Sequence, residues 1–255
     1  MAFARLRNPI VLVHGLMGFD AVRVRGFRLR GYFPGVEESL RAAGNHVHCA
    51  SLSPTAGVAH RADELRAFLD HVSPTDPVHV IAHSMGGLDA RYMIAQLGMA
   101  DRVLSLTTIG TPHRGSPFAD WGLRRLERYV KPFFKLLSLP DQAFYDLTTD
   151  GCRAFNDQVP DAPGVRYFSI AGRCSLAWLS LEWLIPHEVV RRAEGPNDGL
   201  VSIASATWGE QTDVWDGDHV SLVNWPNAQA CALGVWRCRR RQYAALVGRL
   251  ADAGF

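Results

Sequence analysis

Short continuous apolar runs alternate with amphipathic stretches along most of the chain. The apolar runs have the length and character of strands buried on both faces of a sheet. They occupy residues 9–13, 47–52, 78–82, 103–109, 165–171 and 212–215. Helix-like stretches lie between and after them, at residues 36–43, 57–72, 84–97 and 242–253. This alternation predicts an α/β fold with a mainly parallel central sheet flanked by helices, in one domain spanning residues 1–255.

Two longer apolar stretches interrupt the alternation. Residues 118–150 interleave aromatic and leucine side chains with arginine and lysine, and residues 174–190 are rich in leucine and tryptophan. Both are more apolar than a connection across a sheet requires. They fit either ordinary core helices or a cap above a functional site. We predict a helical lid insertion at about residues 117–160 and a possible second cap segment at 174–192.

Composition limits the classes of function. The 255 residues are 47% apolar and carry a net charge of +2, so there is no strong signal for nucleic-acid binding. The one basic cluster is interpreted as a solvated helix face near the C-terminus. It comprises Arg237, Arg239, Arg240 and Arg241. Five cysteines without metal-binding spacing favour free thiols, although one pair could bridge in an oxidising compartment.

The N-terminal residues bear on location. Residues 1–9 are basic, and the apolar run that follows is far too short for a signal-peptide core or a membrane span. We expect no transmembrane segment. A cytoplasmic protein and a secreted protein that has lost its signal both fit the sequence.

One serine stands at the centre of a strand–turn–helix pattern. The apolar run of residues 78–82 continues into Ala82-His83-Ser84-Met85-Gly86, and a helix-like stretch follows. Hydrolases use such a turn, the nucleophile elbow, to lift a serine hydroxyl clear of the backbone. Glycine is common at the position of Ala82, and alanine is small enough for the tight packing there. Ser84 is therefore the candidate nucleophile.

A serine nucleophile needs a base within hydrogen-bond reach and a third group that orients the base. In the α/β-hydrolase chain order the acid follows the serine, and the histidine follows the acid. Only His113, His187 and His219 follow Ser84. His113 has no convincing acid before it, and His187 lies in the second apolar stretch. His219 follows a predicted strand in a polar loop and is the candidate base.

The candidate acid is Asp198, in a turn with Gly199 that leads into an apolar run. Asp213, Asp216 and Asp218 are alternatives close to His219 in sequence, and they are interpreted as solvated turn residues. Asp89 follows Ser84 by about one helical turn and is interpreted as a packing or surface residue.

Acyl transfer also needs N–H donors for the oxyanion of the tetrahedral intermediate. The Met85 N–H follows the nucleophile and supplies one donor. Leu16, in the glycine-flanked loop of residues 14–18, is the natural second donor. His14 is interpreted as a loop histidine with satisfied hydrogen bonds. The candidate substrate-binding residues are Met17, Phe118, Trp121, Leu200 and Val220.

These motifs resemble the bacterial triacylglycerol lipase family, the true lipases of the α/β-hydrolase superfamily. The matching segments lie at residues 9–16, 82–91, 109–116, 147–156, 197–202 and around His219. The resemblance spans nearly the whole chain. It implies Ser84 as nucleophile, Asp198 as acid and His219 as base. It also implies Leu16 and Met85 as oxyanion donors.

Many members of that family carry a structural calcium, with an aspartate ligand two residues after the catalytic histidine. Ser221 stands at that position here. A hydroxyl is a poor replacement for a carboxylate on a hard cation. We therefore expect no cofactor and no metal, and a structural calcium stays the open alternative.

The sequence as a whole predicts a serine carboxylic-ester hydrolase, a lipase or esterase that works through an acyl-enzyme. Its partner would be a small-molecule or lipid ester with an apolar acyl part, and we expect transient contact with a lipid interface. An acyltransferase or a thioesterase could use the same residues. A non-catalytic ligand-binding protein with the hydrolase fold is the alternative from another class.

Overall fold

A parallel sheet organises the molecule. The structure is a computed structural model that describes residues 3–16, 18, 21–24, 27–126, 142–176, 179, 181–234 and 236–255. Within these residues a six-stranded sheet has the order β4-β1-β5-β6-β7-β8, and each neighbouring pair is parallel. Its strands are β1 (Ile10–Val13), β4 (Val47–Cys49), β5 (Val78–His83), β6 (Val103–Ile109), β7 (Arg166–Arg173) and β8 (Gln211–Asp216). Each coincides with a predicted strand, so the predicted fold class is confirmed.

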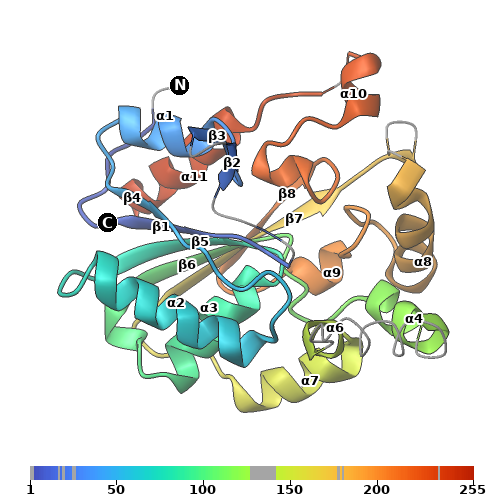
Figure 1. Ribbon diagram of the computed structural model, residues 1–255, viewed down its shortest axis with the longest axis horizontal. Helices are drawn as coiled ribbons and strands as arrows, with labels where there is room; N and C mark the ends of the chain where they lie inside the picture. The colour runs from blue at the N-terminus through green and yellow to red at the C-terminus, as the bar shows by residue number, and fades with distance from the viewer. Residues whose placement is uncertain are drawn as a thin grey trace.

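Helices cover both faces of the sheet (Figure 1). One face packs against α2 (Val58–Val72) and α3 (Gly86–Gln96), and the other against α1 (Val36–Ala42) and α11 (Arg240–Asp252). Leu65 and Leu69 of α2 lie in the first core, and Leu246 and Leu250 of α11 lie in the second. Because both faces are buried, the strands are apolar at successive positions rather than at alternate ones.

The carboxyl ends of the central strands meet at one edge of the sheet. His83 at the end of β5 pairs with Ile109 at the end of β6, and Ile109 pairs with Ile170 of β7. Loops that follow these strands therefore come together at this edge, where α/β proteins commonly bind ligands.

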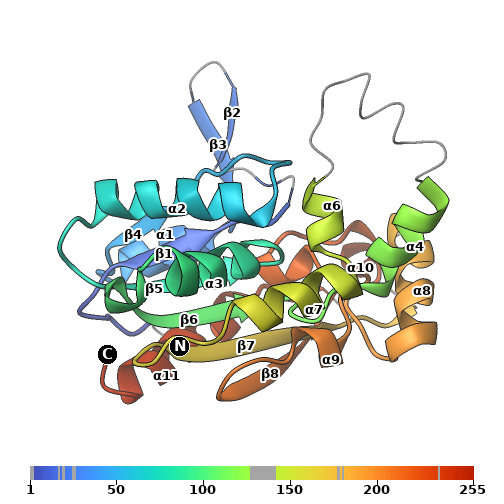
Figure 2. The ribbon, with the colours of Figure 1, turned by 90° about the horizontal axis from the view of Figure 1, so that it is seen from below.

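Further helices gather beyond this edge (Figures 1 and 2). They are α4 (Pro117–Leu126), α6 (Gln142–Asp146), α7 (Thr149–Gln158) and α8 (Leu184–Glu194), and α4 contacts each of the other three. The first three fall within the predicted lid, and α8 overlaps the predicted second cap segment and extends two residues beyond it. Residues 127–141, 177, 178 and 180 of those segments lie outside the described residues, so the lid and its boundaries stay predictions.

A hairpin that the sequence analysis did not predict projects from the main sheet (Figure 2). Its antiparallel strands are β2 (Ala21–Val24) and β3 (Phe27–Gly31), too short for a clear periodic signal.

The remaining short elements are η1 (Ala100–Arg102), η3 (Leu181–Trp183), α9 (Ile203–Ala206), η4 (Ser221–Val223) and α10 (Ala228–Ala232). The five cysteines are free thiols. In the described part of the chain, no helix has the length and apolar character needed to cross a bilayer.

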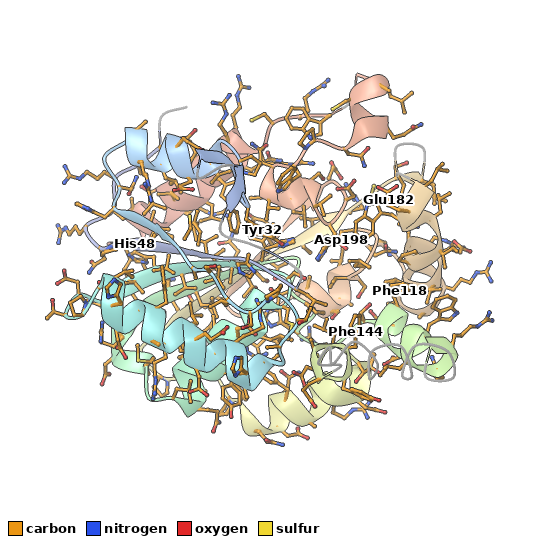
Figure 3. All side chains as sticks on the ribbon, viewed as in Figure 1. Tyr32, His48, Phe118, Phe144, Glu182 and Asp198 are labelled. Carbon is orange, nitrogen blue, oxygen red and sulfur yellow. The ribbon has the colours of Figure 1, made fainter. Side chains whose placement is uncertain are left out.

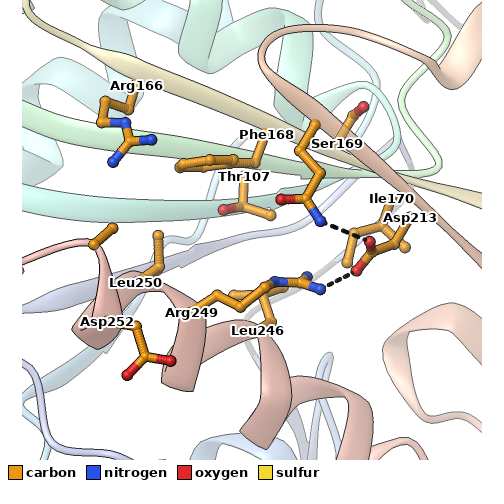
Figure 4. Close-up of a pocket in the computed structure, with 12 residues that line it drawn as sticks. Thr107, Arg166, Phe168, Ser169, Ile170, Asp213, Leu246, Arg249, Leu250 and Asp252 are labelled. Carbon is orange, nitrogen blue, oxygen red and sulfur yellow. Dashed lines mark hydrogen bonds and ion pairs between the residues drawn. The ribbon is translucent and has the colours of Figure 1, made fainter.

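A cavity of about 290 Å³ lies between α11 and strands β6, β7 and β8 (Figure 4). Its lining combines apolar groups such as Phe168 and Leu246 with an ion pair of 2.5 Å between Arg249 and Asp213. Of the residues considered for the site, only the alternative acid Asp213 is among the described residues that line it. The candidate chemistry therefore lies elsewhere, at the carboxyl edge of the sheet.

Candidate active site

The turn after β5 holds Ser84 in a strained backbone conformation. Ser84 has a φ of 55°, in the left-handed region that residues other than glycine seldom adopt. Its N–H donates to the Ile109 carbonyl at 2.9 Å, and Thr111 Oγ1 donates to the Ser84 carbonyl at 2.8 Å. Helix α3 begins at Gly86, immediately after the turn. A strand, a strained serine and a helix in this order have the geometry of a nucleophile elbow.

A continuous chain of hydrogen bonds runs from Ser84 to Asp198. Ser84 Oγ donates to His219 Nε2 at 2.9 Å. On the other side of the ring, His219 Nδ1 donates to Asp198 Oδ2 at 2.7 Å. Asp198 and His219 are buried, whereas Ser84 is half-buried. The structure thus brings together the predicted nucleophile, base and acid.

Backbone donors fix the orientation of the Asp198 carboxylate. Its Oδ1 accepts the N–H groups of Leu200 at 3.0 Å and Val201 at 2.8 Å, which leaves Oδ2 for His219. The His219 N–H also donates to the Asp198 carbonyl at 2.8 Å. Gly199 makes the turn possible, because its φ of 108° is accessible almost only to glycine. The acidic turn therefore holds one carboxylate oxygen toward the imidazole.

The loop after β1 lies directly against the nucleophile. A Cβ atom on Gly15 would lie 2.7 Å from Ser84 Cβ and 3.2 Å from Ser84 Oγ, so only glycine allows this approach. Leu16 follows Gly15 in this loop, and Met85 follows Ser84. Among the described residues, no protein acceptor is assigned to the N–H of either Leu16 or Met85. The role of both N–H groups as oxyanion donors stays a prediction.

A buried ion pair that the sequence analysis missed supports this loop. Arg61 Nε of α2 lies 2.8 Å from Asp89 Oδ2 of α3, and both side chains are 0% exposed. Arg61 Nη2 also donates to the His14 carbonyl at 2.8 Å, which holds the backbone of the loop before Leu16. Burial raises the pKa of Asp89, and the Arg61 charge opposes that rise. Of the two interpretations of Asp89, the packing residue is therefore confirmed and the surface residue is wrong.

We expect replacement of Arg61 with methionine to destabilise the fold by about 3–5 kcal/mol, because it leaves Asp89 buried without a counter-charge. Urea denaturation would measure the free energy of unfolding. Arg66→Met is the matched control, since Arg66 is exposed on the same helix. Adding Asp89→Leu to Arg61→Met should restore part of the loss. A single-variant loss below about 1 kcal/mol, as for an exposed ion pair, would contradict this expectation.

Tyr32 and His83, which the sequence analysis also missed as site residues, link the loops around the nucleophile. Tyr32 Oη donates to His83 Nδ1 at 2.8 Å, and His83 Nε2 donates to the His219 carbonyl at 3.0 Å. The Gly15 N–H donates to Tyr32 Oη at 3.3 Å. Burial lowers the pKa of His83 well below its usual value and raises the pKa of Tyr32 to about 12. Two neutral side chains therefore connect the Gly15 loop to the loop of His219.

The other histidines lie apart from the hydrogen-bond chain. His14 is satisfied in its loop, as predicted, through Nδ1 to the Gly15 carbonyl at 2.8 Å and Nε2 to the Leu52 N–H at 3.0 Å. His113 Nε2 lies 2.9 Å from Thr108 Oγ1. His187 Nε2 lies 3.3 Å from the Cys174 carbonyl.

The alternative aspartates have other partners. Asp213 pairs with Arg249 at 2.5 Å and Asp216 with Arg173 at 2.7 Å. Asp218 is only 2% exposed, so its interpretation as a solvated turn residue was wrong. Its carboxylate accepts from the Ser221 N–H of its own loop and from Asn227, directly before α10, rather than from the imidazole of His219.

The candidate substrate-binding residues lie in two places. Phe118 and Trp121 stack on each other in α4, with ring centroids 5.6 Å apart. Figure 3 shows Phe118 on the side of α4 and α8, and Asp198 nearer the centre of the molecule. Leu200 and Val220 are half-buried beside Asp198 and His219 in the chain. Met17 lies outside the described residues, and substrate contact by all five stays a prediction.

The parallel sheet and the strained serine between β5 and α3 define the α/β-hydrolase class. A family model described as the PGAP1-like alpha/beta domain matches residues 64–223. The chain is 33% identical to triacylglycerol lipase 2 of Saccharomyces cerevisiae, over 87% of this chain and 81% of the yeast protein. It is 31% identical to the triacylglycerol lipase of Pseudomonas fragi, over 86% of this chain and 88% of that protein.

Solved structures agree on the fold. The lipase of Staphylococcus hyicus has a TM-score of 0.72 at 18% identity, covering 95% of this chain and 95% of the lipase. A metagenomic carboxyl esterase also has a TM-score of 0.72 at 18% identity, covering 99% of this chain and 77% of the esterase.

The chain belongs to the triacylglycerol lipases of the α/β-hydrolase superfamily, which confirms the resemblance seen in its motifs. Its activity is that of a carboxylic-ester hydrolase.

Proposed function

We propose that this protein is a lipase that hydrolyses lipid esters through an acyl-enzyme on Ser84, with His219 as base and Asp198 as acid. The observation that carries the proposal is the hydrogen-bond chain from Ser84 Oγ through His219 to Asp198. The triacylglycerol lipases of yeast and Pseudomonas fragi support the substrate class. Acyl transfer, thioester hydrolysis and non-catalytic binding gain no support from the comparisons.

The first step forms the acyl-enzyme. Ser84 Oγ attacks the ester carbonyl carbon while its proton moves to His219 Nε2, 2.9 Å away. The imidazole becomes a cation, which Asp198 Oδ2 stabilises through the hydrogen bond to Nδ1. The carbonyl oxygen becomes an oxyanion, and the N–H groups of Leu16 and Met85 donate to it. One such donor is typically worth about 10²-fold or more in rate.

The intermediate then collapses. The bond between the carbonyl carbon and the alcohol oxygen breaks, and His219 gives its proton to the leaving alcohol. A water molecule next attacks the acyl-enzyme, and His219 takes a proton from that water. Cleavage of the bond to Ser84 Oγ releases the acid, and the proton returns to Ser84. These steps use only groups of this chain and water.

Apolar side chains near the site favour an apolar acyl part and a lipid interface. Trp183 packs against Gly199, next to the acid, so η3 borders the site. Close to Trp183 in the chain, Leu181 is 83% exposed and Ile185 is 61% exposed. Large exposed aliphatic groups in one region commonly mark an interaction surface. We propose that the exposed surface around η3, with Leu181 and Ile185, makes transient contact with aggregated lipid.

Active-site labelling combined with an ester series tests the proposal. A fluorophosphonate probe should label the intact protein once, and mass spectrometry should map the label to the peptide that contains Ser84. The protein should also hydrolyse p-nitrophenyl esters, with acyl chains longer than acetyl preferred, and emulsified triacylglycerol. Ester binding without labelling would instead favour the non-catalytic alternative. Labelling with preferential transfer of the acyl group to an added alcohol would favour the acyltransferase.

A further inference from the structure

We infer that the guanidinium of Arg239 is the built-in cation that holds the loop of His219, in place of a bound calcium ion. The inference rests on the proposed role of His219 as base. It concerns residues 216–224, which connect the end of β8 to the segment before α10.

Arg239 is buried, unlike the rest of its basic cluster. It is 5% exposed, whereas Arg237, Arg240 and Arg241 are exposed, so its interpretation as part of a solvated face was wrong. It stands directly before α11, where its N–H donates to Asn224 Oδ1 at 2.7 Å. The backbone of Arg239 is thus tied to the end of the loop that carries His219.

The guanidinium binds the same loop on both sides of His219. Nη2 donates to the Asp216 carbonyl, and Nε donates to the Ser221 carbonyl at 3.3 Å. The group also lies tightly against Gly217, because a Cβ atom there would clash with Arg239 Nη2. One planar cation therefore fixes the residues before and after the base.

Asp218 supplies the nearby negative charge. Burial lowers the pKa of Arg239, and the charges of Asp218 and Asp216 oppose that shift. Each oxygen of the Asp218 carboxylate accepts a donor, the Ser221 N–H on Oδ1 at 2.8 Å and the Asn227 amide on Oδ2. A buried charge is tolerated only when such partners surround it.

The donor set beneath this loop does not fit calcium. Calcium takes about six to eight oxygen ligands. Here both oxygens of Asp218 accept protein donors, and Ser221 Oγ donates to the Asp218 carbonyl at 2.9 Å. Two backbone carbonyls of the loop already bind the guanidinium. Across the described ranges of the chain, no group of three or more His, Cys, Asp or Glu side chains could hold a metal ion.

Replacement of Arg239 with methionine tests the positioning role. The methionine keeps much of the apolar stem but donates to neither carbonyl, so the loop can shift His219 relative to Ser84. We expect kcat for a soluble p-nitrophenyl ester to fall by about 10- to 100-fold, with KM little changed. Arg239→Lys keeps the positive charge but not the planar guanidinium with its several N–H donors. It should recover part of the loss. Arg241→Met is the matched control, because Arg241 is exposed on α11.

Chelation tests the other half of the inference. Activity and thermal midpoint of the unmodified protein should not change with excess EDTA or added calcium. A folded Arg239→Met protein with unchanged kcat would overturn the positioning role, and if that variant does not fold, an unchanged kcat in Arg239→Lys would do so. Loss of activity in EDTA with recovery in calcium would overturn the metal independence. Failure of the unmodified protein to react with a fluorophosphonate would instead be failure of the proposed function.

Discussion

Replacing Ser84 with alanine is expected to abolish ester hydrolysis, with kcat reduced by at least about 10⁴-fold. The change removes the attacking oxygen and leaves His219, Asp198 and the oxyanion donors in place. Initial rates with p-nitrophenyl esters, measured at high enzyme concentration, would determine the residual kcat. Because one half-buried hydroxyl is lost, the free energy of unfolding should change by no more than about 1 kcal/mol.

Ser51→Ala is the matched control for that experiment, since Ser51 is exposed and distant in sequence from the elbow. It should keep full activity and full fluorophosphonate labelling, whereas Ser84→Ala should lose both. Turnover retained by a folded Ser84→Ala protein would rule out Ser84 as the nucleophile. Lost turnover together with a large loss of stability would point to a structural role of the strained turn instead.

The strands and the residues of the hydrogen-bond chain could be predicted because their signals are local. Strand β6 matches its predicted range, residues 103–109, since its residues are almost all buried and therefore apolar in succession. Ser84 was found from the strand before it and the small residues around it. The order of the residues in the chain then indicated His219 as the base among the later histidines. The acidic turn with Gly199 indicated Asp198 as the acid.

The supporting charges could not be predicted because their partners come from distant elements. Arg61 pairs with a residue 28 positions away, and Arg239 Nη2 binds the carbonyl of a residue 23 positions away. The sequence held a signal for Arg61, because Arg61 shares a helix face of α2 with the apolar residues Val58, Leu65 and Leu69. A charge on an apolar face implies a buried partner. The sequence held no such signal for Arg239, because its neighbours in the chain are exposed arginines.

Replacing Asp198 with asparagine is expected to lower kcat by about 10⁴-fold, while Asp216→Asn should change it little. The reason is the hydrogen-bond pattern of the acid. Oδ1 accepts two backbone N–H groups, so the amide oxygen of asparagine would occupy that position and its NH₂ would face His219 Nδ1. The imidazole would then carry its proton on Nε2, where it cannot accept the proton of Ser84. Pre-steady-state and steady-state rates with a p-nitrophenyl ester would measure the loss.

Asp216 is the matched comparison because it also lies near His219 in the chain, but its carboxylate pairs with Arg173 at an exposed position. Its contact with Arg239 runs through the backbone carbonyl, which asparagine keeps. A larger loss in Asp216→Asn than in Asp198→Asn would move the acid to the loop of His219. Equal small losses would mean that the imidazole needs no carboxylate partner, and the acid role of Asp198 would be wrong. The expected contrast follows from one oxygen atom, Asp198 Oδ2, because it is the acceptor that fixes the proton of His219 on Nδ1.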